Sequence, residues 1–316
     1  MNGTARPAGP AGTDDAAIET VGLSKRYGHT VALAGLTMRV RYGQVFGFLG
    51  PNGAGKTTAV KLLLGLARPT GGGGRLLGAP LGDRAARRRV GYLPELFRYQ
   101  PWLTARDVLG LHADLVHIER SDRGAAIEEA LGVVGLADRG HDRVGTFSKG
   151  MQQRLGLGVA LLGRPDVVFL DEPTSALDPI GRLDVRSIIH GLRERGTTVF
   201  LNSHLLTEVE RVCDEIAIVD HGGVVAAGPL DELLGASTVR VRVTGLTDAG
   251  RADLARFGAV SDDPPWIVLR GCPPERVPDL VAALVASGVR VYEVDAGRES
   301  LEERFLQLLG HAPEPP

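Results

Sequence analysis

The stretch GPNGAGKTT, from Gly50 to Thr58, constrains the fold of this chain more than any other part of its sequence. It contains the pattern G-x-x-x-x-G-K-[ST], and it lies between the apolar run QVFGFL and the helical pattern TTAVKLLLGL. Glycines at these positions let backbone N–H groups surround a phosphate, while Lys56 reaches the outer phosphates and Thr57 offers a hydroxyl to Mg²⁺. A structural turn is the alternative, but the flanking strand and helix favour a nucleotide site. The predicted binding residues are Gly50, Pro51, Asn52, Gly53, Ala54, Gly55, Lys56, Thr57 and Thr58.

Charge and cysteine content exclude some classes of protein. The net charge of −2 and the pI of about 6.5 provide no overall basic field, so nucleic acid is not an expected partner. The two cysteines, Cys213 and Cys272, form no C-x-x-C motif, which suits a reducing cytosol. No apolar stretch approaches the ~20 residues of a membrane span, and the first residues lack the apolar centre of a signal peptide. We therefore expect any membrane role to depend on a partner chain.

The pattern of apolar and polar residues divides the 316-residue chain into one large and one small domain. Residues 1–16 are polar and rich in proline and glycine, which predicts a disordered tail. Residues 17–234 alternate apolar runs with helical patterns, as in an α/β fold with a mainly parallel core sheet and an antiparallel β edge. Only helical patterns occupy about residues 104–163, which predicts an inserted helical subdomain. Residues 235–316 have a β-α-β-α-β order, which predicts a small α+β domain of ferredoxin-like layout.

The run VVFLDEP places two acids, Asp171 and Glu172, at the carboxyl end of a predicted buried strand. Side chains at this end of a parallel sheet face the phosphate loop, so Asp171 is expected to hold Mg²⁺ through water. Glu172 is then placed to accept a proton from an attacking water as general base. The alternative is that one acid caps the following helix, but the phosphate loop favours the catalytic interpretation.

A second candidate anion site lies in FSKGMQQRL, from Phe147 to Leu155. A small hydroxyl and a glycine precede a helical run there, so free N–H groups and the positive end of the helix dipole would face outward at residues 148–151. One nucleotide per chain does not by itself explain two phosphate sites.

Six short motifs occur in the order and rough spacing of the ATP-binding cassette of ABC transporters, and residues 23–228 resemble that cassette. The motifs are KRYG, GPNGAGKTT, FSKGMQQRL, VVFLDEP, SALD and NSH. In that family two subunits meet head to tail, and the signature of one subunit covers the ATP in the phosphate loop of the other. The signature usually reads Leu-Ser-Gly-Gly-Gln, and Ser148, Gly150 and Gln152 match it. The positions that differ are Phe147, Lys149 and Met151.

The resemblance also implies roles for single residues. Tyr27 resembles the aromatic residue that stacks on adenine, with an ordinary surface tyrosine as the alternative. Asp178, in SALD, resembles the loop that crosses between subunits. His204 resembles the switch histidine that contacts the γ-phosphate and steadies the attacking water. Glu95 stands where many cassettes have glutamine; its carboxylate can still reach Mg²⁺ or its water, although it adds negative charge near the phosphates.

The function implied is that of the ATP-hydrolysing subunit of an ABC transporter, which dimerises around two ATP molecules and drives a separate membrane permease. Its partners are then a second copy or a paralogous cassette, and the permease, which holds it at the cytoplasmic face of the membrane. The alternative function is a soluble ABC ATPase that acts on ribosomes or DNA. Such proteins usually carry two cassettes or a long coiled coil, and this chain has one cassette without a coiled coil.

The direction of transport and the contact with the permease rest on weaker signals. The ending SLEERFLQLL resembles extensions of drug-exporter subunits, which favours export of a drug, antibiotic or lipid-like compound. Segment Leu96–Leu103 lies where a permease's coupling helix docks in such cassettes. Its residues Tyr99, Pro101 and Trp102 are expected either to contact the permease or to pack against the helical subdomain.

Overall fold

The structure is a computed structural model that describes residues 15–175, 177–235, 237–297 and 300–310. Of the tail predicted for residues 1–16, residues 1–14 lie outside this description, and Ala16 already begins a strand. The chain divides into two compact units, Met1–Ala227 and Gly228–Pro316, so the division comes before the boundary predicted at residue 234.

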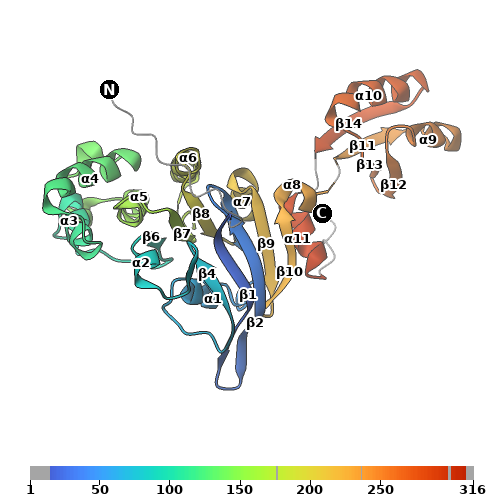
Figure 1. Cartoon of the computed structure of the whole chain (residues 1–316). Helices are drawn as coiled ribbons and strands as arrows, with labels where there is room; N and C mark the ends of the chain where they lie inside the picture. The colour runs from blue at the N-terminus through green and yellow to red at the C-terminus, as the bar shows by residue number, and fades with distance from the viewer. Residues whose placement is uncertain (1–14, 176, 236, 298–299, 311–316) are drawn as a thin grey trace. The chain divides into compact units, whose positions relative to one another are not determined.

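The first unit contains a four-stranded antiparallel sheet in the order β2-β1-β4-β5. β1 (Ala16–Tyr27) and β2 (Thr30–Arg41) form a long hairpin, drawn in blue in Figure 1. β4 (Gly71–Leu76) lies next to β1, and β5 (Ala79–Pro80) lies next to β4. β2 buries alternate residues along its second half, so the sheet turns one apolar face to the core. The antiparallel strands expected near the start therefore form a sheet of their own.

β4 carries four glycines, a composition that strand propensity would not favour. Its glycines allow a close approach to β1. A Cβ atom at Gly72, where φ is 65°, would lie 2.1 Å from the carbonyl oxygen of Gly22, and one at Gly74 would lie 2.5 Å from that of Glu19. Glycine is therefore needed at Gly72 and Gly74 because β1 leaves no room there for a side chain.

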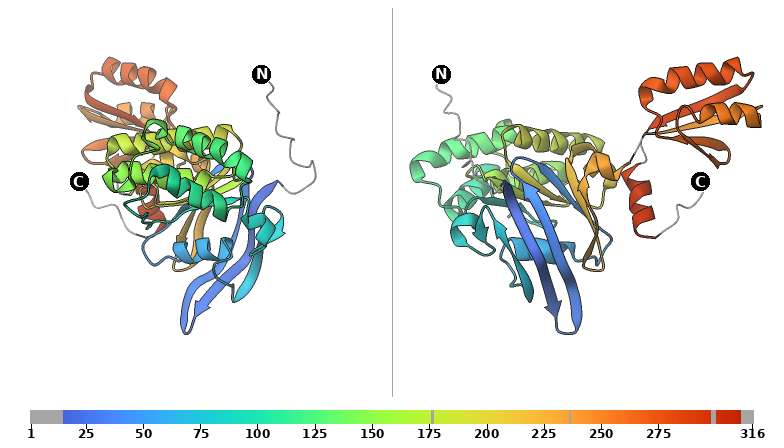
Figure 2. Two further views of the ribbon diagram at one scale, coloured as in Figure 1. Left: turned by 90° about the vertical axis from the view of Figure 1, so that its left-hand side faces the viewer. Right: turned by 45° about the vertical axis from the view of Figure 1, so that its right-hand side comes forward.

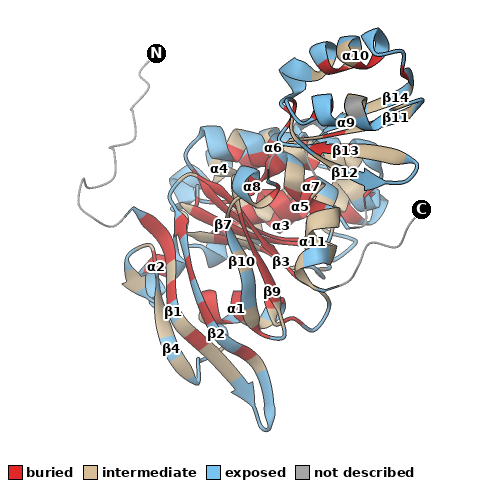
Figure 3. Ribbon diagram, turned by 90° about the vertical axis from the view of Figure 1, so that its right-hand side faces the viewer, coloured by how far each residue is buried: buried red, intermediate tan, exposed pale blue. Residues whose placement is uncertain are grey.

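The second sheet has six strands in the order β10-β9-β3-β8-β7-β6, and β9/β3, β3/β8, β8/β7 and β7/β6 are parallel pairs. Every residue of β3, β7 and β8 is buried (Figure 3), as expected for a parallel sheet that is covered on both faces. Phe46, Phe48 and Phe169 pack around Phe200 with ring centroids 5.1 to 5.7 Å apart. The strands are β3 (Val45–Leu49), β6 (Val90–Leu93), β7 (Val167–Asp171), β8 (Thr198–Asn202), β9 (Glu215–Asp220) and β10 (Gly223–Pro229).

An inserted helical subdomain lies beside β6 and consists of α3 (Ala105–Leu115), α4 (Arg120–Val133) and α5 (Lys149–Leu161), which contact one another (Figure 2). α5 packs on β6 at Gly91, where a Cβ would lie 1.9 Å from the carbonyl oxygen of Ala160. Further helices of the unit are α1 (Lys56–Leu63), α2 (Arg84–Arg87), α6 (Pro179–Glu194) and α7 (Leu206–Val212), with 3-10 turns at Ala137–Arg139 and Val144–Thr146.

The second unit is built on an antiparallel sheet in the order β12-β13-β11-β14, with the β-α-β-β-α-β succession of a ferredoxin-like fold. The predicted order lacked β12, because this edge strand reads AVSDD and four of its five residues are exposed. The core of the second unit includes Val239, Val241, Leu269 and Leu280. The elements are α8 (Leu230–Leu233), β11 (Thr238–Thr244), α9 (Asp248–Leu254), β12 (Ala259–Asp263), β13 (Trp266–Arg270), a 3-10 turn (Pro274–Arg276), α10 (Val277–Ala286), β14 (Arg290–Gly297) and α11 (Leu301–Leu308).

Two properties of the whole chain bear on its surroundings. Cys213 and Cys272 are both free thiols and both buried. Within the described ranges, no helix is at once long enough and apolar enough to cross a membrane.

Candidate nucleotide site

The loop after β3 has a backbone that only glycine can form at several positions. Gly53 and Gly55 have φ of 84° and 99°, in the left-handed region where other residues are strained. A Cβ at Gly50 would lie 2.2 Å from the carbonyl oxygen of Val219, and one at Gly55 would lie 2.3 Å from that of Ala32. The loop is therefore pressed between β2 and β9.

Lys56 begins α1 at the end of this loop and is only 8% exposed. Its Nζ donates hydrogen bonds to the carbonyl oxygens of Gly50 (2.7 Å) and Pro51 (3.1 Å). Burial lowers the pKa of Lys56 below its ordinary value. An ammonium has three N–H donors, so the loop holds a cation with one donor left for a phosphate.

Three carboxylates from neighbouring strand ends act on Lys56. Asp171 is the last residue of β7, Glu172 follows it, and Glu95 comes two residues after β6. Their negative charges oppose the larger effect of burial on the pKa of Lys56, and Glu172 contributes most among them. Tyr92 of β6 is part of the same cluster, since burial and the charges of Asp171 and Glu95 raise the pKa of Tyr92 to about 12. The parallel sheet thus gathers the predicted acids around the phosphate loop.

Asn202, the last residue of β8, was not assigned a role from the sequence. It pairs with Asp171 in the parallel register, and its Nδ2 donates to Asp171 Oδ1 (2.5 Å). Burial raises the pKa of Asp171, whereas this hydrogen bond works in the opposite direction. The signal was available, because VVFLD and TVFLN are adjacent buried strands that each end in a polar residue.

Glu172 has an unusual backbone and a histidine neighbour. Its φ of 52° lies in the left-handed region, and its N–H donates to the carbonyl oxygen of Asn202 (2.8 Å). Its Oε2 lies 2.7 Å from Nδ1 of His204, although the contact lacks the angles of a hydrogen bond. The Glu172 side chain is 8% exposed and that of His204 is 56% exposed. A strained acid and a solvent-facing imidazole therefore meet at the sheet edge.

The family follows from comparisons with known proteins. A family model described as ABC transporter matches residues 33–175. An uncharacterised ABC transporter ATP-binding protein of Nostoc sp. is 45% identical over 88% of this chain and 83% of that protein. The chain belongs to the ABC transporter ATP-binding proteins.

Two relatives of this ATP-binding subunit are named for antibiotics. The bacitracin transport ATP-binding protein of Bacillus licheniformis is 34% identical over 93% of this chain and 97% of that protein. The daunorubicin/doxorubicin resistance ATP-binding protein of Streptomyces peucetius is 35% identical over 93% of each. A solved structure of an ABC transporter's ATP-binding subunit has 30% identity and a TM-score of 0.62, over 68% of this chain and 91% of that one. These matches confirm the predicted family, the cassette fold and the ATPase activity.

The signature segment of the subunit begins α5. Ser148 is the N-cap, and its Oγ accepts a hydrogen bond from the N–H of Met151 (3.2 Å). Gln152 Nε2 donates to the carbonyl oxygen of Phe147 (3.3 Å). The first turn of α5 contains no acidic residue, so its dipole is not compensated there. Both segments are described, and no hydrogen bond or ion pair joins residues 147–152 to the phosphate loop.

The next predicted segment, SALD, lies against the signature. A Cβ at Gly150 would be 3.7 Å from Cδ2 of Leu177, so these two segments are in contact. Asp178 is the N-cap of α6, and its Oδ1 accepts a hydrogen bond from the N–H of Gly181 (2.7 Å). Asp178 therefore has a structural role in the single chain, whichever contact it makes with another subunit. Ala176 lies outside the described residues.

Tyr27 ends β1 and is 49% exposed. The Nζ of Lys25 lies 4.9 Å from the centroid of its ring and donates a hydrogen bond to the carbonyl oxygen of Arg68 (2.6 Å). The ring is thus a fixed, accessible surface beside a cation, which suits an adenine base without requiring one.

The polar groups at the sheet edge suit Mg²⁺. Thr57 and Glu95 are exposed, whereas Asp171 is buried and feels the charge of Glu95. Asn202 Oδ1 and Glu172 Oε2 are buried atoms without a hydrogen-bond partner, which metal-bound water would satisfy. In the part of the chain that is described, no three His, Cys, Asp or Glu side chains are grouped to hold a metal by themselves. Mg²⁺ commonly takes only one or two protein ligands together with phosphates and waters.

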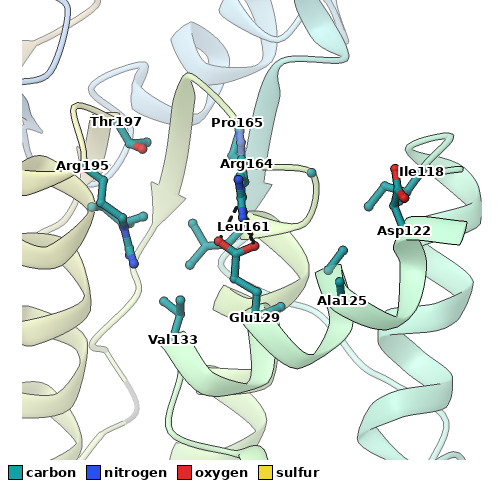
Figure 4. A pocket seen from close by; sticks show the side chains of 14 residues that line it. Ile118, Asp122, Ala125, Glu129, Val133, Leu161, Arg164, Pro165, Arg195 and Thr197 are labelled. Carbon is teal, nitrogen blue, oxygen red and sulfur yellow. Dashed lines mark hydrogen bonds and ion pairs between the residues drawn. The ribbon is translucent and has the colours of Figure 1, made fainter. Parts of the chain in front are cut away.

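A groove of about 810 Å³ lies elsewhere in the subunit, between α4, the end of α5 and the end of α6 (Figure 4). Its lining is mainly apolar, with Val133, Leu161 and Leu192 among the contributors. On it, Arg164 and Glu129 form a bidentate ion pair with distances of 2.8 to 3.0 Å. No predicted site residue lines this groove, so it is separate from the nucleotide site.

Proposed function

We propose that this subunit hydrolyses ATP at the carboxyl edge of its parallel sheet, with Glu172 as general base. The observation that carries the proposal is the meeting of Lys56, Asp171, Glu172 and His204 around one glycine-rich loop. The loop N–H groups and Lys56 bind the phosphates, and Glu172 accepts the proton of the attacking water. His204, beside Glu172, orients that water and contacts the γ-phosphate.

Thr57, Asp171 and Glu95 are proposed to hold Mg²⁺, which would neutralise charge on the phosphate oxygens. The Thr57 hydroxyl would supply an oxygen ligand, Asp171 would hold the ion through water, and Glu95 would reach the ion or its water. Tyr27 stacks on the adenine, which places the base beside the turn between β1 and β2.

A second subunit completes each site in this proposal. Ser148, Gly150 and Gln152 begin a helix whose first turn carries no acidic residue and makes no hydrogen bond or ion pair to its own phosphate loop. Two chains arranged head to tail would place this helix start on the ATP of the partner, with Asp178 near the crossing. The partner is a second copy of this chain or a paralogous cassette.

The third component is a membrane permease, which would hold the subunit at the cytoplasmic face of the membrane. The segment 96–103 leaves Leu96 87% exposed and Trp102 65% exposed, and Leu111 and Leu115 of α3 are 54% and 65% exposed. Tyr99 instead packs between Phe97 and His112 at ring distances of 5.3 and 5.9 Å. Trp102 and Leu96, rather than Tyr99, are therefore the residues that support permease contact.

The transported compound is proposed to be a drug, antibiotic or lipid-like molecule moved outward. Support comes from the names of two relatives, one for bacitracin transport and one for daunorubicin and doxorubicin resistance. The two names give different compounds, while the two ATP-binding proteins are about equally similar to this chain. The choice of substrate is accordingly assigned to the permease.

Mixed dimers test whether sites form between chains. One arrangement pairs a wild-type chain with a differently tagged chain that carries both Lys56→Ala and Ser148→Arg. The other arrangement places Lys56→Ala on one chain and Ser148→Arg on its partner. Arginine is chosen because its bulk blocks the helix start, where alanine would only weaken the contact. ATP occlusion is measured, since steady turnover depends on both sites.

Sites formed between chains predict no intact site in the first arrangement and one in the second, so ATP is occluded only in the second. Sites confined to one chain predict the reverse. Occlusion in the first arrangement alone would therefore overturn the head-to-tail proposal and leave the phosphate loop assignment untouched.

A further inference from the structure

The helix that follows His204 is too short to hold its own place. α7 has seven residues, and its N-cap, Leu205, provides no side-chain cap. The link to His204 is a tight turn, in which Ser203 Oγ accepts a hydrogen bond from the N–H of Leu205 (3.1 Å). Short helices are marginal without tertiary contacts, so whatever fixes α7 also fixes the position of His204.

One face of α7 packs on the strand that leads into the phosphate loop. A Cβ at Gly47 of β3 would lie 3.0 Å from Cγ1 of Val209 and 3.0 Å from Sγ of Cys213. Glycine at this position lets α7 rest directly on β3. This apolar contact holds the helix down on the sheet, but it does not determine the direction in which its first turn points.

A buried ion pair supplies the second contact. Glu208, in the first turn of α7, lies with its Oε2 3.0 Å from Nε of Arg186 on α6, and the two side chains are only 8% and 17% exposed. The contact lacks the angles of a hydrogen bond, and neither atom has a hydrogen-bond partner among the described residues. Apolar residues of the same size would fill this space at a lower cost in desolvation, so the pair is better explained by the direction it imposes than by stability.

We infer that Arg186 and Glu208 are positioning residues, which hold the first turn of α7 against α6 so that His204 stays beside Glu172. The inference rests on the proposed role of His204. Glu208 follows His204 by four residues and lies in the first turn of the helix that begins after it. Asp178 is the N-cap of α6 and follows Leu177, which contacts the signature. The pair thus joins the helix that follows the histidine to the helix that starts at the predicted subunit crossing.

A double-mutant cycle on the full chain tests this inference. Glu208→Gln and His204→Ala are made singly and together, and the rate of ATP hydrolysis is measured by single turnover, which resolves slow variants. Glu208→Gln is expected to lower the rate about tenfold or more, because displacement of a reacting group by about 1 Å can cost a hundredfold. In the His204→Ala background, Glu208→Gln should change the rate less than about twofold, since the histidine that Glu208 positions is absent.

Two further variants separate positioning from folding. Arg186→Met with Glu208→Leu replaces the pair by apolar groups, and it should melt near the wild-type temperature and bind ATP normally while hydrolysing it slowly. Arg193→Met is the matched control, because Arg193 also lies on α6 and forms an ion pair with Asp214 (2.5 Å), but it is 49% exposed. It should change hydrolysis less than about twofold.

The outcomes distinguish two failures. Equal effects of Glu208→Gln with and without His204, or normal hydrolysis in the apolar double variant, would overturn the positioning role and leave the proposed function standing. Normal hydrolysis in His204→Ala alone would remove His204 from the proposed function and the pair's role with it.

Discussion

The six-stranded sheet of the first unit and the sheet of the second unit are built in opposite ways. In the first unit all five residues of β7 and of β8 are buried, whereas in the second unit no residue of β14 is buried. The six-stranded sheet of the first unit is mainly parallel and covered on both faces, whereas the sheet of the second unit is antiparallel with alternating residues turned outward. Burial on both faces makes a strand apolar along its length, so polar residues are left at its ends.

Strand direction then decides where chemistry can gather. Parallel strands bring all their carboxyl ends to one edge, which is why Asp171 and Asn202 are neighbours and Glu172 and His204 follow them there. Antiparallel strands divide their carboxyl ends between two edges, so the sheet of the second unit does not gather polar residues in this way. The comparison predicts that catalysis depends on the first unit, and four experiments test it.

The largest effect is expected from Glu172→Gln. Loss of the general base should slow ATP hydrolysis by about 10²- to 10⁴-fold, while MgATP still binds and dimers accumulate. Glu293→Gln is the control in the second unit, where Glu293 pairs with Arg242 on the exposed sheet surface, and it should leave the rate unchanged. Near-normal turnover in Glu172→Gln would remove Glu172 from its role.

Lys56→Ala should weaken ATP binding itself by about ten- to a hundredfold, because it removes a charge-assisted hydrogen bond to phosphate. Lys61→Ala is the matched control, since Lys61 lies later on α1 and is exposed. Equilibrium binding of a fluorescent ATP analogue measures both. Equal affinities in the two variants would contradict the phosphate loop assignment.

Asp171→Asn should abolish activity and yet stabilise the nucleotide-free chain, by about 1 kcal/mol at neutral pH. Burial raises the pKa of Asp171 above its ordinary value of 3.8, so the native state binds this proton more tightly than the unfolded state. The stability of the wild-type chain therefore falls as pH rises from the ordinary pKa, which applies in the unfolded state, to the raised pKa of the native state. The extra stability of the variant should shrink as pH is lowered through the same range.

Urea unfolding at several pH values checks this prediction. Asp295→Asn, at an exposed position of β14, is the control in the second unit and should change little at any pH. The prediction is wrong if the Asp171→Asn chain is less stable than wild type at neutral pH. That result would show that the ionised Asp171 carboxylate stabilises the fold of the wild-type chain.

The smallest effect on the site is expected from removing the second unit. A chain that ends after Leu234 should fold and bind ATP within about twofold of the full chain, because each unit has its own apolar core. Thermal unfolding and ATP binding measure this. An insoluble product, or one without a cooperative transition, would show that the units depend on each other.

Much of the fold was accessible from the sequence. Continuous apolar runs predicted the buried strands, and the fold class, the family and the ATPase activity are confirmed. The site residues stay predictions, although the structure brings Lys56, Asp171, Glu172 and His204 together. β4 and β12 were missed for different reasons. One carries glycines because of a close neighbour, and the other is an exposed edge strand with few apolar residues.

The sequence by itself determined which groups are present and in which local setting: a glycine-rich loop between a strand and a helix, acids after a buried strand, and a hydroxyl before a helix. These are local patterns, fixed by backbone conformation and periodicity over a few residues. Only the tertiary structure decided that Asn202 bonds Asp171 and that Arg186 meets Glu208. Such contacts join residues far apart in the chain, and their partners are set by strand register and helix packing, which no single segment encodes.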